Sequence, residues 1–301
     1  MLLQAIIQIV PKNKTVLVCD DVYGGTGRLF RKIYAKYDIT FKFIDMREIS
    51  EVEKNIDENV FMVWIESPTN PTLKIIDIEK ISSLAKKFQA ITIVDNTFCS
   101  PVFQKPLELG ADAVVHSTTK YIGGHSDIIG GAIMMSHEKL YEELSFHQMA
   151  IGSIPSPFDC FLISRSIKTL GVRMKQHEIN AYEIAKFLKD HPKCHHVLYP
   201  GLECHPQYQL AKKQMKGFSG MISFELDGSY EDILRFFKHL NIFILAESLG
   251  GVESLINHPE KMTHASVPEN LRKKLGIHSK LIRLSASINI FRCLKNLSIS
   301  S

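Results

Sequence analysis

The segment FMVWIESPTNPTLKIIDIEKISSLAKKFQAITIVDNT (61–97) contains two short apolar runs separated by an amphipathic stretch. The runs FMVWI (61–65) and ITIV (91–94) are almost continuously apolar, as strands that are buried on both faces of a sheet tend to be. Between them, residues 78–88 carry apolar side chains at helical spacing, which predicts a helix packed against the sheet. The segment therefore indicates a strand–helix–strand unit with two parallel strands.

The same alternation extends over the first half of the chain. Short apolar runs alternate with amphipathic stretches, and this order is typical of a doubly wound α/β fold with a mostly parallel sheet. The other candidate strands of this sheet are VLVC (16–19), FKFI (41–44), AVVH (113–116) and AIMM (132–135). We therefore expect a fold of the α/β class.

The pattern changes after residue 157 and predicts three parts. Residues 1–157 would form a large domain around the mostly parallel sheet. Residues 158–189 contain no proline and a single glycine, so they would form one or two long linking helices. Residues 190–301 would form a smaller C-terminal α+β domain, whose candidate strands are GMISFEL (220–226), FILA (243–246) and LIRLS (281–285).

The composition argues against several classes of protein. The chain has 301 residues, of which 45% are hydrophobic and 23% charged, with a net charge of +4. It contains no dense Lys/Arg tract and no apolar run of the ~20 residues that a membrane helix needs, so we expect neither nucleic-acid nor membrane binding. Six scattered cysteines without a CxxC pair, and the lack of secretory-signal features, favour a cytoplasmic protein with reduced thiols. The His/Cys-rich segment 191–205 lacks the spacing of a zinc site, so no metal is expected.

Polar side chains follow four of the apolar runs. They are Tyr23, Glu66, Asn70, Asp95, Ser117, Thr119 and Lys120. Ligands of open parallel sheets bind outside the carboxyl ends of the strands, so these side chains would meet in one crevice. A single polar residue at a strand end more often marks only the place where the chain reaches solvent. The prediction of a binding crevice therefore depends on the occurrence of all these residue types together.

The residue types in this crevice fit one kind of chemistry. A lysine such as Lys120 can form an imine with an aldehyde. A carboxylate such as Asp95 can keep a pyridinium nitrogen protonated. The hydroxyls of Ser117 and Thr119 can bond a phosphate, and Tyr23 can stack on a flat ring. Together these residues indicate a pocket for pyridoxal phosphate.

Eight motifs, in order along nearly the whole chain, carry a family resemblance. They are DDVYGGTGR (20–28), WIESPTNPT (64–72), VDNTF (94–98), HSTTKYIGGHSD (116–127), IPSPFDC (154–160), LAESLGGVESL (245–255), MTHAS (262–266) and IRLS (282–285). The chain resembles the Cys/Met-metabolism family of pyridoxal-phosphate-dependent enzymes. The resemblance implies the type I fold of pyridoxal-phosphate-dependent transferases, with a large, mostly parallel sheet domain and a smaller C-terminal α+β domain.

The resemblance assigns six residues to the cofactor, one of which, Asn70, also contacts the substrate. Lys120 would hold pyridoxal phosphate covalently and, once released, would act as the catalytic base that moves protons. Tyr23 would stack on the ring and assist proton transfer. Asp95 would pair with the ring nitrogen. Ser117 and Thr119 would hold the phosphate.

The resemblance assigns the substrate to another set of residues. Asn70 would contact both the ring hydroxyl of the cofactor and the substrate carboxylate. Arg283 would clamp the α-carboxylate, with Ser248 beside it. Glu247 would face the distal amino group of the substrate, and Arg28 would lie at the entrance.

Within the family, the motifs are most similar to those of cystathionine γ-lyases. The resemblance therefore implies cleavage of cystathionine to cysteine, 2-oxobutanoate and ammonia, in transsulfuration and cysteine biosynthesis, with hydrogen sulfide release from cysteine as a further activity. It also implies a homotetramer. Two alternatives stay open: cystathionine γ-synthase activity, and a non-catalytic chain that associates with full-length subunits.

Both ends of the chain depart from the family pattern. Family members carry an N-terminal serine–glycine loop and a tyrosine/arginine pair that contact the cofactor phosphate, and neither motif precedes Asp20. The segment 286–301 lacks the glycine, the acidic stretch and the long closing helix of the family. We therefore expect a chain shortened at its N-terminus and altered at its C-terminus. Its affinity for the cofactor would be reduced, because charge-assisted hydrogen bonds to phosphate stabilise by about 1.5–3 kcal/mol each.

Overall fold

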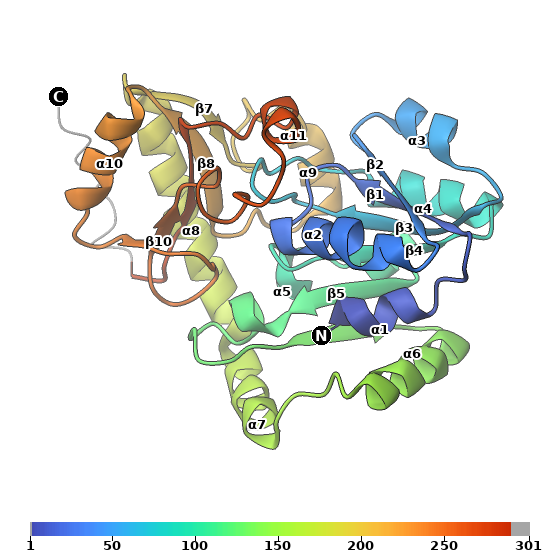
Figure 1. Ribbon diagram of the computed structural model, residues 1–301. Coiled ribbons are helices and arrows are strands. Elements are labelled where there is room, and N and C mark those ends of the chain that lie inside the picture. Colours follow the sequence, from blue (N-terminus) through green and yellow to red (C-terminus); the bar gives the residue numbers. More distant parts are fainter. Residues whose placement is uncertain (1, 290–301) are drawn as a thin grey trace.

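The computed structural model describes residues 2–289. Figure 1 shows two sheets, with a long helix running beside the second one. Residues 290–301 of the C-terminal segment that we expect to be altered lie outside the described residues. Within residues 2–289, each helix is too short or too polar to cross a membrane.

The first sheet has six strands in the order β2-β1-β3-β4-β5-β6. All neighbouring strands are parallel except β5 and β6, which are antiparallel. This confirms the mostly parallel sheet and the α/β class. The bounds are β1 (Thr15–Cys19), β2 (Thr40–Ile44), β3 (Val60–Glu66), β4 (Ile91–Asp95), β5 (Ala113–Ser117) and β6 (Gly131–Met135).

The helices of this half lie against the sheet (Figure 1). The helix expected over residues 78–88 is α4 (Ile78–Lys87), which buries Ile78, Ile81 and Ala85. Asp77 caps its N-terminus, and the Asp77 carboxylate accepts from the Lys80 amide. The other helices are α1 (Leu2–Gln8), α2 (Gly24–Lys32), η1 (Tyr34–Lys36), α3 (Ile49–Asn55), α5 (Ser100–Phe103), η2 (Pro106–Leu109), η3 (Thr118–Ile122) and α6 (Glu138–Ile151).

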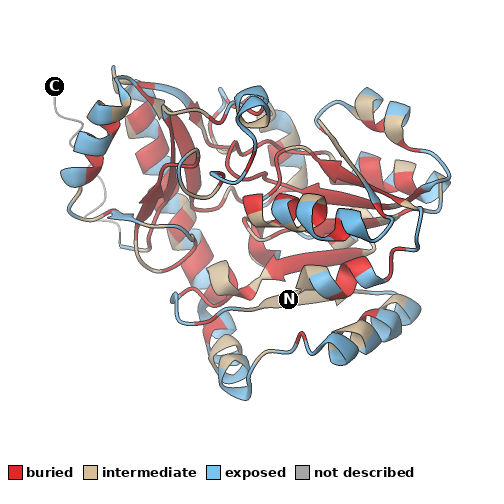
Figure 2. Cartoon of the chain, in the orientation of Figure 1, coloured by how far each residue is buried: buried red, intermediate tan, exposed pale blue. Residues whose placement is uncertain are grey.

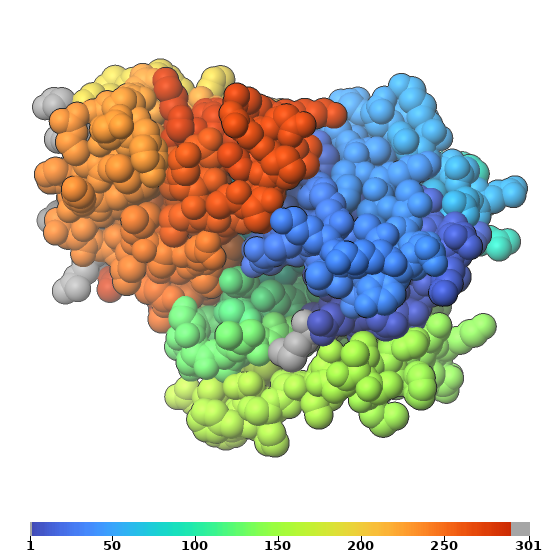
Figure 3. Space-filling model, viewed as in Figure 1, coloured from blue at the N-terminus to red at the C-terminus, as the bar shows by residue number. Residues whose placement is uncertain are grey.

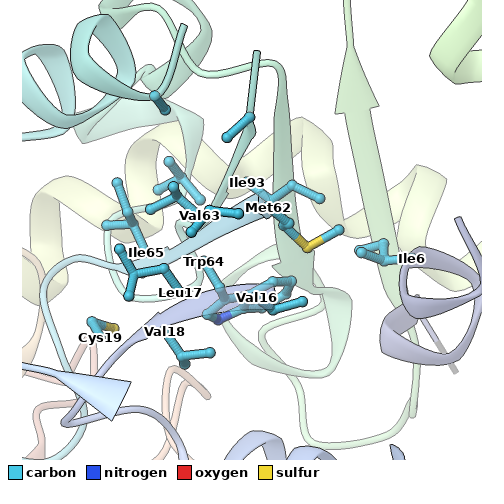
Figure 4. Close-up of a cluster of buried hydrophobic side chains, with 14 of the residues drawn as sticks. Ile6, Val16, Leu17, Val18, Cys19, Met62, Val63, Trp64, Ile65 and Ile93 are labelled. Atoms are coloured by element: carbon cyan, nitrogen blue, oxygen red, sulfur yellow. The ribbon is translucent and has the colours of Figure 1, made fainter. Parts of the chain in front are cut away.

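Continuous apolar runs form the core of the first sheet. Figure 2 shows its central strands mostly buried, and Figure 4 shows side chains of this core packed around Trp64. The edge strands β2 and β6 are mainly half-buried. Trp64 is fully buried and meets Phe30 edge to face, with ring centroids 5.7 Å apart. The runs 16–19 and 61–65 are buried on both faces because helices cover the sheet, as their lack of alternation predicts.

Replacing Trp64 with alanine is expected to lower the free energy of unfolding by about 3–5 kcal/mol, because the cavity left in a packed core cannot close. Denaturant titration followed by circular dichroism measures the change. The exposed Tyr37→Ala variant is the control and should stay close to wild type. A loss below about 1 kcal/mol at Trp64 would contradict this account of the core.

The second half begins with two helices joined by a short 3-10 turn. These are α7 (Pro157–Ser166), η4 (Ile167–Thr169) and α8 (Leu170–Asp190). The second sheet has the order β7-β8-β11-β10-β9 and is antiparallel except for the β9/β10 pair. Its elements are β7 (Cys194–Leu198), α9 (Tyr208–Gln214), β8 (Met221–Leu226), α10 (Tyr230–Lys238), β9 (Ile244–Leu245), β10 (Leu255–Asn257), α11 (Glu269–Lys274) and β11 (Leu281–Ser285). The domain boundaries at residues 157 and 190 stay a prediction.

Candidate active site

A cavity of about 600 Å³ lies at the carboxyl ends of β3, β4 and β5 and is closed by residues of the second half. This is the sheet edge where a parallel sheet is expected to bind its ligand. Nine of the ten side chains expected at the site line this cavity. They are Tyr23, Asn70, Asp95, Ser117, Thr119, Lys120, Glu247, Ser248 and Arg283.

Lys120 follows β5, within η3, and has a backbone conformation (φ −92°, ψ −132°) that is not helical. Its Nζ donates to the Ser248 hydroxyl at 2.7 Å. Burial lowers the pKa of Lys120 to about 8, with a further lowering by Arg283 and an opposing effect of Glu247. An amine that loses its proton this close to neutrality is available as a nucleophile and as a base.

Asp95 ends β4 and carries a half-buried carboxylate that has no cationic partner within residues 2–289. One of its oxygens accepts from the Thr97 amide at 3.0 Å, and among residues 2–289 no lysine, arginine or histidine pairs with it. Burial raises its pKa. Since an isolated, partly buried carboxylate is costly, the position suits a ligand with a protonated ring nitrogen. The residues present therefore fit pyridoxal phosphate.

Glu66 lies beside Asp95, because the two residues are paired in the register of β3 and β4. Its carboxylate accepts from the Tyr23 amide at 2.9 Å. Burial raises the pKa of Glu66 well above its usual range, and the charge of Asp95 raises it further. Glu66 thus fixes the backbone of Tyr23, a contact that the sequence alone did not reveal.

Tyr23 precedes the first residue of α2 and is 46% exposed. Its ring lies over Gly25, where a Cβ would stand 2.4 Å from the ring. The absence of a side chain at Gly25 therefore lets the ring rest against the first turn of the helix. The ring lines the cavity on the side of the second half, together with Thr263.

Two hydroxyls expected to hold a phosphate lie after β5. The Thr119 hydroxyl accepts from the Gly130 amide at 2.9 Å and donates to the Gly130 carbonyl at 3.3 Å. The Ser117 amide donates to the Thr97 hydroxyl at 2.9 Å. Both side chains line the cavity, but Thr119 is tied to the chain before β6, so its hydroxyl must turn in order to donate to a ligand. Their phosphate role stays a prediction.

Arg283 on β11 is fully buried and reaches the cavity from the second sheet. Its guanidinium donates to the Asn70 side-chain oxygen at 2.8 Å and to the Ser248 carbonyl at 2.9 Å. Burial lowers its pKa to about 10. Among the described residues no carboxylate forms an ion pair with it, so a carboxylate of a ligand would supply the missing charge.

Two further residues hold Arg283 and Asn70 in place: Asn257 contacts Arg283, and His264 contacts Asn70. Asn257 lies opposite Arg283 in the antiparallel pair of β10 and β11, and its amide oxygen accepts from Arg283 Nε at 3.1 Å once the amide is turned. His264 Nε2 lies 3.1 Å from the Asn70 carbonyl. The motif MTHAS contained His264, but only the cross-strand register reveals Asn257.

Glu247 and Arg28 differ in their relation to the cavity. Glu247 is exposed and lines the cavity next to Ser248, without an ion pair among residues 2–289. Arg28 is also exposed, but it lines a separate hollow between α2 and the start of α11. The structure therefore does not bring Arg28 into the cavity with the others, and its role at the substrate entrance stays a prediction.

The amino-acid sequence of the chain matches a known family of enzymes. Residues 2–295 match the sequence model of the Cys/Met metabolism PLP-dependent enzymes. The chain is 49% identical over 286 residues to a cystathionine gamma-lyase of Dictyostelium discoideum, covering 95% of this chain and 74% of that protein. It is 47% identical over 293 residues to a cystathionine beta-lyase of Coxiella burnetii, covering 97% and 76%.

Solved structures agree with the sequence comparisons. The cystathionine gamma-lyase of Lactobacillus plantarum, complexed with L-serine, superposes with a TM-score of 0.96 at 40% identity, covering 99% of this chain and 78% of that one. A cystathionine gamma synthase of Xanthomonas oryzae pv. oryzae, complexed with cystathionine, gives a TM-score of 0.95 at 41% identity, covering 99% and 78%. These matches confirm the expected fold type and cofactor. The chain belongs to the Cys/Met-metabolism family of pyridoxal-phosphate-dependent enzymes.

Proposed function

We propose that this lyase cleaves cystathionine to cysteine, 2-oxobutanoate and ammonia. The observation that carries the proposal is the arrangement of three groups around one cavity: a lysine with a lowered pKa, a half-buried carboxylate with a raised pKa and a buried arginine. Bound pyridoxal phosphate supplies an aldehyde that takes up the substrate amine and a protonated ring that draws electrons from Cα. The chain supplies binding, orientation and proton transfer.

Arg283 and Asn70 orient the substrate in this proposal. The guanidinium already points one nitrogen at the Asn70 oxygen, 2.8 Å away, so the two side chains form one polar surface for an α-carboxylate. A planar guanidinium binds a carboxylate through two parallel hydrogen bonds, which fixes the direction of the Cα–H bond. Burial of the pair excludes water and strengthens this contact.

Lys120 moves the protons. Its Nζ is held by the Ser248 hydroxyl at 2.7 Å, on the side of the cavity where Arg283 lies. With a pKa of about 8, the amine can accept the proton of Cα and later that of Cβ, and in its protonated form it can donate a proton to the sulfur as the Cγ–S bond breaks. Asp95, which lines the same cavity, would pair with the ring nitrogen of the bound cofactor and keep it protonated.

The capture of pyridoxal phosphate by the cofactor-free enzyme is expected to speed up about tenfold between pH 7 and pH 9, because only neutral Lys120 attacks the aldehyde and its pKa is about 8. Stopped-flow absorbance of the lysine-bound cofactor measures the rate. A reference reaction of free Nα-acetyl-lysine with the cofactor, with its rate expressed per neutral amine, corrects for ionisation of the cofactor itself. A corrected rate that is flat, or whose midpoint lies near the pKa of free lysine, would contradict the assignment.

Glu247 is proposed to contact the distal ammonium group of cystathionine at the edge of the cavity. Glu247→Gln should raise KM for cystathionine about two- to fivefold with little change in kcat, since an exposed ion pair contributes about 0.2–1 kcal/mol. The matched control is a γ-thioether amino acid without a distal amino group, whose KM should not change. Equal changes for both substrates would show that Glu247 acts in some other way.

A synthase function is the second candidate, because the chain is as similar to a cystathionine gamma synthase in structure (TM-score 0.95) as to a gamma-lyase (0.96). Product analysis separates the two. Purified enzyme with pyridoxal phosphate is given cystathionine alone, or an activated homoserine ester with cysteine. Release of 2-oxobutanoate and cysteine from cystathionine supports the lyase, and net formation of cystathionine supports the synthase. A protein that takes up no cofactor would favour the non-catalytic alternative.

We further propose that the enzyme works in transsulfuration and cysteine biosynthesis, in the cytoplasm, as a homotetramer. Exposed apolar side chains lie on α6, α7 and α8, and they support association with further copies. They include Phe146, Met149, Phe158, Phe161 and Val172. Figure 2 shows exposed residues along α6 and α7.

A further inference from the structure

A second hollow, of about 490 Å³, lies beside the active site between α2 and the segment that leads into α11. We call it the α2–α11 hollow. Figure 3 shows the orange-red residues of the second half directly against the blue residues of the first half. Four cationic side chains line this hollow, which gives it a strong positive charge: Arg28, Arg31, Lys32 and Arg272.

Arg31 is held in place without a counter-ion. Its guanidinium carbon lies 3.6 Å from the centroid of the Phe43 ring. Gly27 makes room for it, because a Cβ there would stand 2.5 Å from Arg31 Nη1. Burial lowers the pKa of Arg31, and no carboxylate among residues 2–289 forms an ion pair with it. A fixed, partly desolvated cation of this kind lacks the partner that usually stabilises it.

Arg272 lines the other side of the hollow. Its Nη1 donates to the Val267 carbonyl, which orients the side chain. Its buried Nε has no hydrogen-bond partner among the described residues. Glu269 also lines the hollow, but its carboxylate is engaged by Lys273 at 2.7 Å. Within the described residues, neither Arg31 nor Arg272 forms an ion pair with a carboxylate.

We propose that the α2–α11 hollow binds a small anion that carries phosphate groups. Planar guanidinium groups match phosphate oxygens through paired hydrogen bonds, and Lys32 adds a mobile positive charge. A volume of about 490 Å³ falls in the range of small-molecule sites and exceeds the needs of a single phosphate. The bound anion supplies the negative charge that Arg31 and Arg272 lack.

The α2–α11 hollow shares no lining residue with the cavity assigned to cofactor and substrate, and of the residues expected at that site it contains only Arg28, whose role at the substrate entrance stays a prediction. Arg283 and Lys120 line only the first cavity, and Arg31 and Arg272 line only the second. The two cavities share the first turn of α2, since Thr26 lines one and Gly27 the other. The proposal stands whether or not the enzyme cleaves cystathionine.

The test is calorimetric titration of pyrophosphate into enzyme saturated with pyridoxal phosphate, in a buffer free of other phosphates. Prior saturation keeps the probe out of the cofactor's own phosphate position. We expect one binding site per chain that weakens as salt rises. Arg31→Gln should weaken binding about tenfold, as expected for one charge-assisted bond, and Lys32→Gln should weaken it by a smaller factor.

The control is Arg165→Gln, which removes the same charge from an exposed position on α7 and should leave the affinity unchanged. Lys32 is exposed, so its variant reports on the site even where Arg31→Gln lowers stability. No binding at millimolar probe, an affinity that neither Arg31→Gln nor Lys32→Gln changes, or an equal loss in Arg165→Gln would each overturn the proposal. Competition between cystathionine and pyrophosphate would place the probe in the wrong cavity and overturn it as well.

Discussion

Lys120→Ala enzyme is expected to lose roughly 10³-fold in kcat, in line with the loss of a positioned acid–base group. It should also lose the absorbance band of lysine-bound cofactor that borohydride removes. The physical reason is that Lys120 is the lysine in the cavity, its pKa is lowered to about 8, and its Nζ is fixed by Ser248 at 2.7 Å. Steady-state kinetics and spectra before and after borohydride measure the two effects.

Two control variants sharpen the Lys120 experiment. Lys120→Arg keeps a cation in the cavity but cannot form the imine, so it should lose activity as fully as the alanine variant. Lys87→Ala removes an exposed lysine at the end of α4 and should behave as wild type. Retained turnover in either Lys120 variant, or a borohydride-sensitive band that survives in Lys120→Ala, would rule out Lys120 as the cofactor lysine.

Asp95→Asn is expected to lower kcat roughly 10²–10³-fold, the range seen when a preorganised electrostatic contact is removed. The amide has nearly the same shape and can still accept from the Thr97 amide at 3.0 Å. It cannot keep a ring nitrogen protonated, so the cofactor would draw electrons less strongly. Kinetics with cystathionine and the position of the cofactor absorbance band measure the loss.

The same substitution should not weaken the cofactor-free fold. Burial raises the pKa of Asp95, so the folded state holds its proton more tightly than the unfolded state does. Its contribution to stability is therefore present at low pH and is lost as the pH rises through the folded-state pKa. At neutral pH the neutral amide should be at least as stable, which a thermal melt of the cofactor-free enzyme would show. Asp227→Asn, at an exposed aspartate that pairs with His195, is the kinetic control. A large drop in melting temperature with normal kcat would contradict both expectations.

Much of the fold follows from local sequence. Strands β3 and β4 could be predicted because apolar runs without alternation need cover on both faces. The strand-end rule then brought Asp95, Ser117 and Lys120 to one edge, because parallel strands share their direction. These predictions depend only on neighbours along the chain and on a general property of sheets.

The direction in which Arg28 points could not be predicted from the sequence motif. A motif places a residue along the helix, but the rotation of the helix decides which way it faces. Thr26 lines the active-site cavity, and Arg28 lies two residues farther along α2, about 200° around the axis at 100° per residue. Arg28 therefore faces the α2–α11 hollow, and this direction depends on how α2 packs against the second half.

Asn257 marks a second limit. It meets Arg283 because β10 and β11 pair in one antiparallel register, and the two residues are far apart in the sequence. A shift by one residue would turn Asn257 to the other face of the sheet. Such long-range pairing leaves no local signal, so the contact could be found only in the folded chain.

The hydrogen bond between Lys120 and Ser248 spans two sheets that no strand connects. The amine of Lys120 is thus carried by one half of the molecule, while Ser248, which holds it, and Arg283, which lies beside Ser248, belong to the other. Chemistry of this kind requires placement to within ~0.5 Å. The packing between the two halves therefore contributes to catalysis. Substitutions far from the cavity that shift one half relative to the other would lower the activity without unfolding the enzyme.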